Sequence, residues 1–193
     1  MEYMEIIRKL RVKFGYIFSL MLIVFAKPRS FPLFVIGSIV ASIGEFFRVW
    51  AATYIVKLDR LTTCGPYKAT RNPLYFGSFL LGTGLLIIAF NPIIAAVYYV
   101  LYLAIYPATM SAESRELEKK FHDDYIDYKN STPVFCPDAK GMEKAIADSG
   151  DIFTKFSERF KNFLKNREYN GVLALVAVLV ILYWKLNKNL KSK

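Results

Sequence analysis

The chain has 193 residues, of which 54% are hydrophobic, with a formal net charge of +10 at pH 7 and a mean hydropathy of +0.29. Soluble domains are usually about 45–50% apolar, and the excess here lies in long blocks separated by charged residues. This pattern argues against a soluble domain and against a nucleic-acid-binding protein, and it predicts an integral membrane protein with basic loops beside anionic headgroups. The two cysteines and the single histidine have no metal-site or disulfide spacing.

Five apolar blocks are candidate membrane-spanning helices. They cover residues 12–26, 31–55, 73–90, 93–110 and 169–186. A tight turn is expected at Asn91-Pro92, because proline cannot continue a helix from the preceding residue. The sequence therefore predicts an all-α integral membrane protein: a bundle of four to five transmembrane helices with a cytoplasmic helical extension after the fourth.

Basic residues predict the orientation of these blocks. Four precede the first block and place the N-terminus in the cytoplasm: Arg8, Lys9, Arg11 and Lys13. Alternation then puts the 57–71 loop and the 111–168 segment on the same side. An odd number of spans conflicts with the rule that basic residues stay in the cytoplasm, because it places the basic 185–193 tail outside. Whether the last block fully crosses the membrane therefore stays open.

The 151–166 segment is expected to form an amphipathic helix. Its apolar stripe contains Ile152, Phe153, Phe156, Phe160, Phe163 and Leu164, with Lys155, Arg159, Lys161 and Lys165 off the stripe. Such a helix suits the headgroup level of a membrane or a packed position against the protein. Whether it acts as a lid or as an anchor stays open.

The stretch "TCGPYKATRNPLYFG" (63–77) precedes the third block. Asn72 is a favoured N-cap, and Pro73 suits the first helical position, so a helix is predicted to start here. Its positive end beside Arg71 suits a carboxylate or phosphate. Gly65-Pro66 predicts a sharp turn, and Gly77 allows a close approach one turn into the helix. An ordinary helix start with a basic anchor is the alternative.

Carboxylates also occur at inward-facing positions. Glu113 shares a helical stripe with apolar residues: Tyr106, Met110, Leu117, Phe121 and Tyr128. A buried carboxylate needs a partner, which could be Arg71 or a bound cation. Glu45 and Arg48 lie three apart in the second block and can pair, either facing a polar cavity or with Arg48 snorkelling to the surface.

Together these stretches resemble the integral-membrane methyltransferase family that includes isoprenylcysteine carboxyl methyltransferases and phospholipid N-methyltransferases. The resemblance runs from about Gly44 to Pro137. Four pieces carry it in the family's order: "GEFFRVWA", "LTTCGPYKATRNPLYFG", "FNP" and "AESRELEKKFHDDYIDYKNSTPVFCP".

The resemblance implies a site for S-adenosylmethionine under the cytoplasmic helix ends. The implied cofactor-binding residues are Gly65, Pro66, Tyr67, Arg71, Asn72, Tyr75, Gly77, Glu113 and Ser114. Arg71 would meet the cofactor's carboxylate and Glu113 its ammonium, and both are assigned to catalysis. Substrate contacts are expected from Glu45, Arg48, Tyr125 and Tyr128. No metal is implied.

Four positions depart from the family pattern. Asn72 replaces the motif histidine, Ser114 replaces the usual second glutamate, and His122 stands where glycine is common. Thr109 replaces the arginine of carboxyl-methylating members, which favours a lipid amine or a hydrophobic thiol or phenol over a prenylcysteine carboxylate. The tyrosine run at residues 98–106 could line the acceptor's path from the bilayer or simply pack.

The expected function is S-adenosylmethionine-dependent methyl transfer to a lipophilic acceptor that enters from the bilayer, with no obligate protein partner. The alternatives are an NADPH-dependent membrane reductase of the sterol-reductase type and a non-catalytic membrane scaffold. The expected segments are a methyltransferase core (1–137), an amphipathic interfacial helix (138–168) and a C-terminal transmembrane helix with a basic tail (169–193). The membrane would be the cell membrane in a prokaryote or the endoplasmic reticulum in a eukaryote, with the cofactor site facing the cytoplasm.

Overall fold

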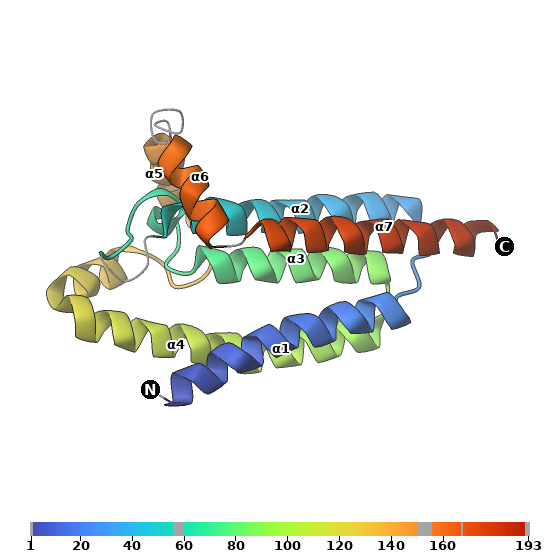
Figure 1. The fold of residues 1–193 in the computed structure, drawn as a ribbon, viewed down its shortest axis with the longest axis horizontal. Coiled ribbons are helices and arrows are strands. Elements are labelled where there is room, and N and C mark those ends of the chain that lie inside the picture. The colour runs from blue at the N-terminus through green and yellow to red at the C-terminus, as the bar shows by residue number, and fades with distance from the viewer. Residues whose placement is uncertain (1, 56–59, 150–155, 167, 192–193) are drawn as a thin grey trace. The chain divides into compact units, whose positions relative to one another are not determined.

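The protein is an all-α membrane protein, as the sequence predicts. The computed structural model describes residues 2–55, 60–149, 156–166 and 168–191, and in the first helix it describes side chains from Phe14 onward. The described residues contain no strand. Figure 1 shows the elements in chain order: α1 (Glu2–Phe25), α2 (Phe31–Tyr54), the short 3-10 helix η1 (Gly65–Lys68), α3 (Pro73–Ala89), α4 (Pro92–Ser131), α5 (Ala139–Asp148), α6 (Phe156–Lys165) and α7 (Tyr169–Lys191).

All five predicted apolar blocks are helical. Within the described residues, α2, α4 and α7 are long and apolar enough to cross a membrane, whereas α3 and the apolar part of α1, Phe14–Phe25, are shorter. The 169–186 block therefore has the length of a full span. The basic side chains expected to orient the N-terminus, at positions 8, 9, 11 and 13, lie outside the described side chains.

The chain divides into two compact units. It passes from one unit to the other four times, each time within a helix. One unit comprises Met1–Ile43, Phe79–Ala112 and Val172–Lys193; the other comprises Gly44–Ser78 and Glu113–Gly171. The first unit holds most of the membrane-spanning length. The second holds the ends of the long helices together with η1, α5 and α6, and it contains every residue of the candidate site.

Glycines and aromatic rings pack the first unit. A Cβ at Gly84 would overlap the backbone of Ala41, so α2 and α3 touch backbone to backbone, as helices in membranes often do. The Tyr98 ring lies 4.5 Å from the Phe18 ring, and Tyr102 stacks on Tyr106 at 3.9 Å. These three tyrosines are buried. The packing interpretation of the tyrosine run therefore accounts for them.

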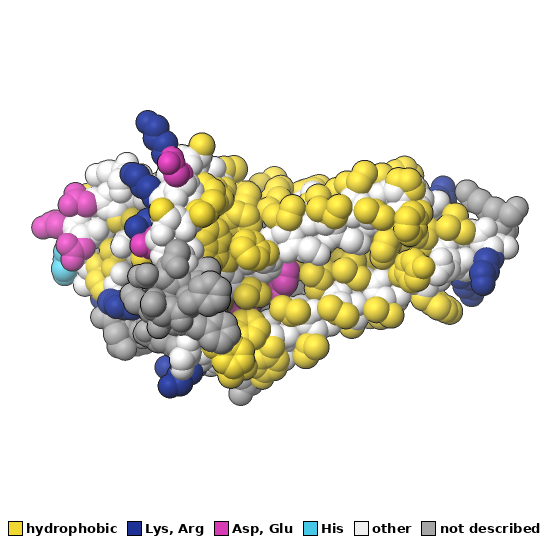
Figure 2. Space-filling view, turned by 90° about the horizontal axis from the view of Figure 1, so that it is seen from above, with side chains coloured by type: hydrophobic (Ala, Val, Ile, Leu, Met, Phe, Trp, Pro, Cys, Tyr) yellow, Lys and Arg dark blue, Asp and Glu magenta, His cyan; other side chains and the backbone are white. Residues whose placement is uncertain are grey.

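The outer surface of the first unit is apolar. Figure 2 shows hydrophobic side chains covering α2 and α7 along most of their length. Ile39 is 55% exposed, and Trp184 is 62% exposed. Because the interior of a bilayer offers no hydrogen-bond partners, such a surface belongs against lipid.

The basic tail of α7 has a structural partner in the same unit. The Lys185 ammonium donates to the carbonyl oxygens of Val24 and Ala26, each at 3.2 Å, and Asn189 donates to Pro28 O at 2.9 Å. These carbonyls would otherwise be unsatisfied at the end of α1. A cation there also suits the negative end of the α1 dipole. Lys185 thus caps α1, and this role does not depend on the preference of basic residues for the cytoplasmic side.

The C-terminal part of α4 folds back on itself at His122. On a straight helix, residues eleven apart are separated by about 16 Å along the axis, yet the Tyr125 hydroxyl donates to Ser114 Oγ at 2.8 Å. Lys129 and Glu118, also eleven apart, form an ion pair at 3.2 Å. His122 has φ 44° and ψ −120°, a conformation that side-chain-bearing residues rarely adopt. Figure 1 shows this turn of α4.

This backbone geometry would suit glycine, the residue that the resemblance implies for position 122, better than histidine. A non-glycine residue held in such a region costs about 1–3 kcal/mol, whereas glycine loses only about 0.5–1 kcal/mol of extra chain entropy on folding. We predict that His122→Gly raises the free energy of unfolding by about 1 kcal/mol. The measurement is the thermal unfolding midpoint in detergent.

Lys119→Gly is the matched control, because Lys119 is exposed in the regular part of α4. That change should lower stability by about 1 kcal/mol, the ordinary cost of glycine inside a helix. A fall of the same size for His122→Gly would contradict the strain at this position.

Candidate functional site

The turn before α3 is held by the end of α5. Gly65 has φ +57°, and a Cβ there would lie 2.5 Å from the Tyr54 ring, so glycine is required at the start of η1. The Gly65 N–H donates to Asp148 Oδ2 at 2.7 Å, and Lys68 forms an ion pair with Asp148 Oδ1 at 3.1 Å. Burial alone would raise the pKa of Asp148, but the Gly65 hydrogen bond and Lys68 together lower it.

Helix α5 was not predicted as a separate helix, because residues 138–168 were expected to form one amphipathic helix. Its start carries a clear cap, because Asp138 Oδ1 accepts a hydrogen bond from the Gly141 N–H at 2.8 Å. Gly141, which weakens the helical signal, is needed because a Cβ there would lie 2.5 Å from Lys68 O. The expected 151–166 helix is described only from 156 onward, as α6; residues 151–155 lie outside the described residues.

The chain after α4 lies along the residues that precede α3. Thr70 Oγ1 donates to Phe135 O at 2.9 Å, the Arg71 N–H to Pro133 O at 2.8 Å, and Asn72 Nδ2 to Val134 O at 2.8 Å. Helix α3 does begin at Pro73, as predicted. The Asn72 side chain, however, bonds the opposite segment, and only its carbonyl accepts the first helical bonds.

Glu113 meets Tyr75 rather than Arg71. The Tyr75 hydroxyl donates to Glu113 Oε1 at 2.7 Å, which joins the first turn of α3 to α4. Arg71 and Glu113 form no ion pair in the described part of the chain, so the salt-bridge interpretation of these two residues is not what the structure contains. The buried Nε of Arg71 has no hydrogen-bond partner among the residues that the structure describes.

Tyr67 lies at the centre of this group. Its carbonyl accepts a hydrogen bond from the Tyr128 hydroxyl at 2.7 Å. Burial raises the pKa of the Tyr67 phenol well above 10, and the nearby Tyr128, Glu113 and Tyr75 raise it further. Tyr67 therefore stays neutral at physiological pH. The hydroxyls of Tyr125 and Tyr128, expected to contact substrate, are engaged with Ser114 and with η1.

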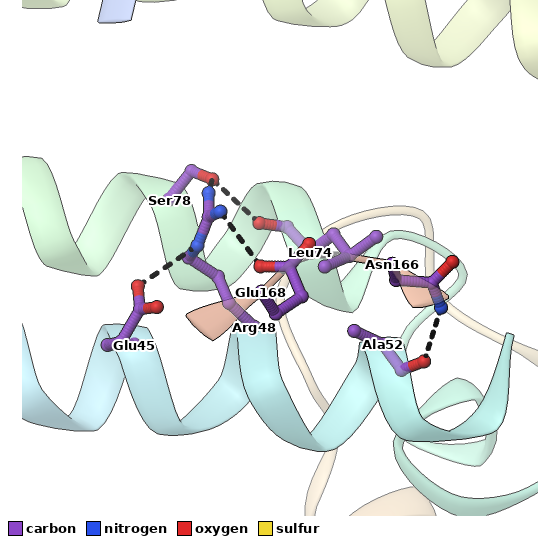
Figure 3. A network of polar contacts seen from close by, with 7 residues as sticks. All are labelled: Glu45, Arg48, Ala52, Leu74, Ser78, Asn166 and Glu168. Carbon is purple, nitrogen blue, oxygen red and sulfur yellow. Dashed lines mark hydrogen bonds and ion pairs between the residues drawn. The ribbon is translucent and has the colours of Figure 1, made fainter. Parts of the chain in front are cut away.

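A second polar cluster surrounds Arg48, which is the only cation among the described residues of the cluster (Figure 3). Its guanidinium lies 3.1 Å from Glu45 Oε2 and 3.1 Å from Glu168 Oε2, and it donates to Ser78 Oγ at 2.8 Å. The predicted pairing of Glu45 with Arg48 is confirmed. Glu45 is buried and neither of its carboxylate oxygens has a hydrogen bond of good geometry. Two carboxylates thus share one cation.

Small residues make room for this cluster. A Cβ at Gly77 would lie 2.6 Å from Gly44 O, which confirms the predicted close approach between α3 and α2. A Cβ at Gly171, at the start of α7, would lie 2.6 Å from Glu45 Oε1. Ser78, Glu168 and Asn166 were not singled out from the sequence, because contacts between residues 30 to 120 positions apart leave no periodic signal.

The two ends of the site carry opposite charges. The unpartnered Nε of Arg71 stands beside the positive end of α3, and Glu113 uses only one of its oxygens to bind Tyr75. A small zwitterion with a carboxylate and an ammonium has the chemistry that such a pair can hold. The described residues contain no group of three side chains that could bind a metal ion. The Thr109 side chain is buried and donates a hydrogen bond to Ile105 O in its own helix at 2.8 Å.

We predict that Arg48→Met lowers the free energy of unfolding by about 3 kcal/mol. Removing one partner of a buried ion pair leaves the other charge uncompensated, and here two carboxylates lose their cation. The thermal midpoint in detergent measures the effect, and adding Glu45→Gln to Arg48→Met should restore part of it.

Arg115→Met is the control, because Arg115 is exposed on α4, and it should change stability by less than about 0.5 kcal/mol. If Arg48→Met behaved like this control, the cluster would contribute nothing to the fold.

Comparison with known proteins places this site within a family. The family model described as phospholipid methyltransferase matches residues 15–124, more than half of the chain. That match covers η1, α3 and Glu113, but it ends before Tyr125 and Tyr128.

Curated relatives are similar to about half of the chain. The nickel-cobalt-cadmium resistance protein NccN of Alcaligenes xylosoxydans xylosoxydans is 32% identical over 110 residues, 56% of this chain and 51% of that protein. The cobalt-zinc-cadmium resistance protein CzcN of Cupriavidus metallidurans is 33% identical over 107 residues, 54% of this chain and 49% of that protein.

The protein-S-isoprenylcysteine O-methyltransferase of Rattus norvegicus is 31% identical over 86 residues, 45% of this chain and 30% of that protein. The chain thus spans about half the length or less of these relatives. No solved structure matches the chain.

Proposed function

Because the chain belongs to the phospholipid methyltransferase family, we propose that it transfers a methyl group from S-adenosylmethionine to a lipophilic acceptor at the membrane. The observation that carries the proposal concerns Arg71, just before α3, and Glu113, on α4. Among the described residues, Arg71 has a buried donor without a partner, and Glu113 is held by Tyr75 through one carboxylate oxygen.

The residues fit the two charged groups of that cofactor. Arg71 and the positive end of α3 would bind its carboxylate. Glu113, oriented by the Tyr75 hydroxyl, would bind its ammonium, and the family's second glutamate is replaced by Ser114, whose hydroxyl accepts from Tyr125. One negative charge thus supports the ammonium where the family pattern has two, so we expect weaker cofactor binding than that pattern would give.

S-adenosylmethionine, when bound, supplies an electrophilic methyl group on a sulfonium. The protein's contribution is then to position the reactants and exclude water. Tyr67 and Tyr75 offer aromatic faces to a cation beside Glu113, and the neutral Tyr67 phenol adds no negative charge at neutral pH. The three hydrogen bonds between residues 70–72 and 133–135 hold the segment after α4 against this region.

For the acceptor we favour a lipid amine, or a hydrophobic thiol or phenol, over a prenylcysteine carboxylate. The neutral, internally bonded Thr109 provides no cation for a carboxylate. The cluster of Glu45, Arg48 and Glu168 has an excess of negative charge, which suits an acceptor that carries an amine. The assignment of Glu45 and Arg48 to substrate binding is part of this proposal.

We predict that the detergent-purified protein binds S-adenosylmethionine and S-adenosylhomocysteine with micromolar affinity in isothermal titration. Glu113→Ala and Arg71→Ala should each weaken binding about 10- to 100-fold, because a hydrogen bond to a charged group is worth about 1.5–3 kcal/mol.

Glu116→Ala and Arg115→Ala are the matched controls, since both residues are exposed on α4 and should leave affinity unchanged. A folded wild-type protein that binds neither ligand would refute the proposal. NADPH binding in its place would support the membrane reductase, and binding of no cofactor would support a non-catalytic scaffold.

A further inference from the structure

Helix α6 is attached across the end of α2 by side-chain amides. Asn162 Nδ2 donates to Thr53 O at 3.1 Å, and Asn166 Nδ2 donates to Ala52 O at 2.9 Å. The last carbonyls of a helix have no partner within it, so α6 supplies the missing donors. The Arg159 guanidinium also lies over the Tyr54 ring, 4.4 Å from its centroid.

These contacts define the face that α6 turns toward the protein. With about 3.6 residues per turn, positions 159, 162 and 166 fall on one side of the helix. Phe160 and Leu164 lie away from that side, 48% and 46% exposed. Lys161 and Lys165, both exposed, lie next to them around the helix. The helix therefore presents an apolar stripe and a neighbouring basic stripe on the side that these contacts leave free.

The position of α6 along the chain is consistent with placing its apolar and basic stripes near a membrane surface. The helix contacts the end of one membrane-spanning helix, α2, and the next one, α7, starts only four residues after Lys165. Figure 1 shows α6 lying crosswise to the axis of α2. A helix at the end of a span and crosswise to it has the direction expected of a helix that lies along a bilayer surface.

We propose that α6 is a membrane-surface helix that binds anionic lipid headgroups. Phe160 and Leu164 lie among the upper acyl chains, while Lys161 and Lys165 contact the phosphates of anionic lipids. The charge of the basic stripe selects anionic lipid over a zwitterionic surface. The two asparagine bonds transmit this attachment to the end of α2, which also carries Arg48. The helix is thus an anchor at the surface beside the site, rather than a lid over it.

A fluorophore on α6 tests its depth in the bilayer. The full-length protein carrying Cys64→Ser, Cys136→Ser and Leu164→Cys is labelled with a nitrobenzoxadiazole group and reconstituted in vesicles. One set of vesicles is phosphatidylcholine, and the other is phosphatidylcholine mixed with phosphatidylglycerol. Quenching by a nitroxide on the lipid acyl chain is compared with quenching by aqueous iodide. A label at Asp124→Cys, an exposed position of α4, is the reference.

We expect the label at position 164 to be quenched severalfold more by lipid nitroxide than by iodide, relative to the label at 124. Phosphatidylglycerol should strengthen this preference by about fivefold for each lysine that contacts the surface. Lys161→Glu combined with Lys165→Glu should abolish that increment. Lys119→Glu combined with Lys120→Glu, which makes the same charge change on α4, should retain it.

Two results would overturn the proposal. Preferential quenching by iodide at position 164 in both vesicles would mean that α6 faces water. Lipid quenching that does not respond to phosphatidylglycerol would exclude anionic headgroups as the ligand. The measurement with the unmodified lysines decides both points even if a charge-reversed variant fails to fold. None of these readouts uses S-adenosylmethionine, so they are independent of the proposed methyl transfer.

Discussion

The reversal of α4 at His122 is the constraint on which the candidate site depends. Because the helix folds back there, Tyr128 reaches the carbonyl of Tyr67 and holds the η1 turn. The same reversal returns the chain to the start of α3, where residues 133–135 bond residues 70–72. A strained backbone at a single residue is stable only when its surroundings determine it strongly. Here the compensating contacts are those that assemble the candidate site.

Charge distribution separates two functions within one unit. At the start of α3, Arg71 and Glu113 do not neutralise one another, and each keeps capacity for a ligand. Around Arg48 the charges are instead paired, and the pairing joins α2 to α3 and to the segment before α7. The first arrangement leaves charged groups that a ligand can engage, whereas the second mainly holds helices together. In the arrangement proposed above, helix α6 connects the end of α2 to the membrane surface.

Local signals in the sequence predicted a large part of this arrangement. Apolar blocks marked the five long helices, Asn72-Pro73 marked the start of α3, and the spacing of Glu45 and Arg48 predicted their ion pair. Each of these features depends on residues close together in the chain. The family resemblance also pointed to position 122, although only the backbone geometry shows why glycine would suit that position.

The features that escaped prediction depend on residues far apart. Tyr75 with Glu113 and Arg48 with Glu168 join segments separated by 38 and 120 positions, and no periodicity encodes such contacts. Helix α5 was obscured by Gly141, whose role is a close approach to η1 rather than a helix break.

The most direct test of the account is transfer of a labelled methyl group from S-adenosylmethionine into the lipids of a host membrane extract. The wild-type protein should label the lipid fraction, Glu116→Ala should do so equally, and Glu113→Ala should lose the label. A wild-type protein that binds the cofactor yet leaves the lipid fraction unlabelled would contradict methyl transfer to a lipophilic acceptor.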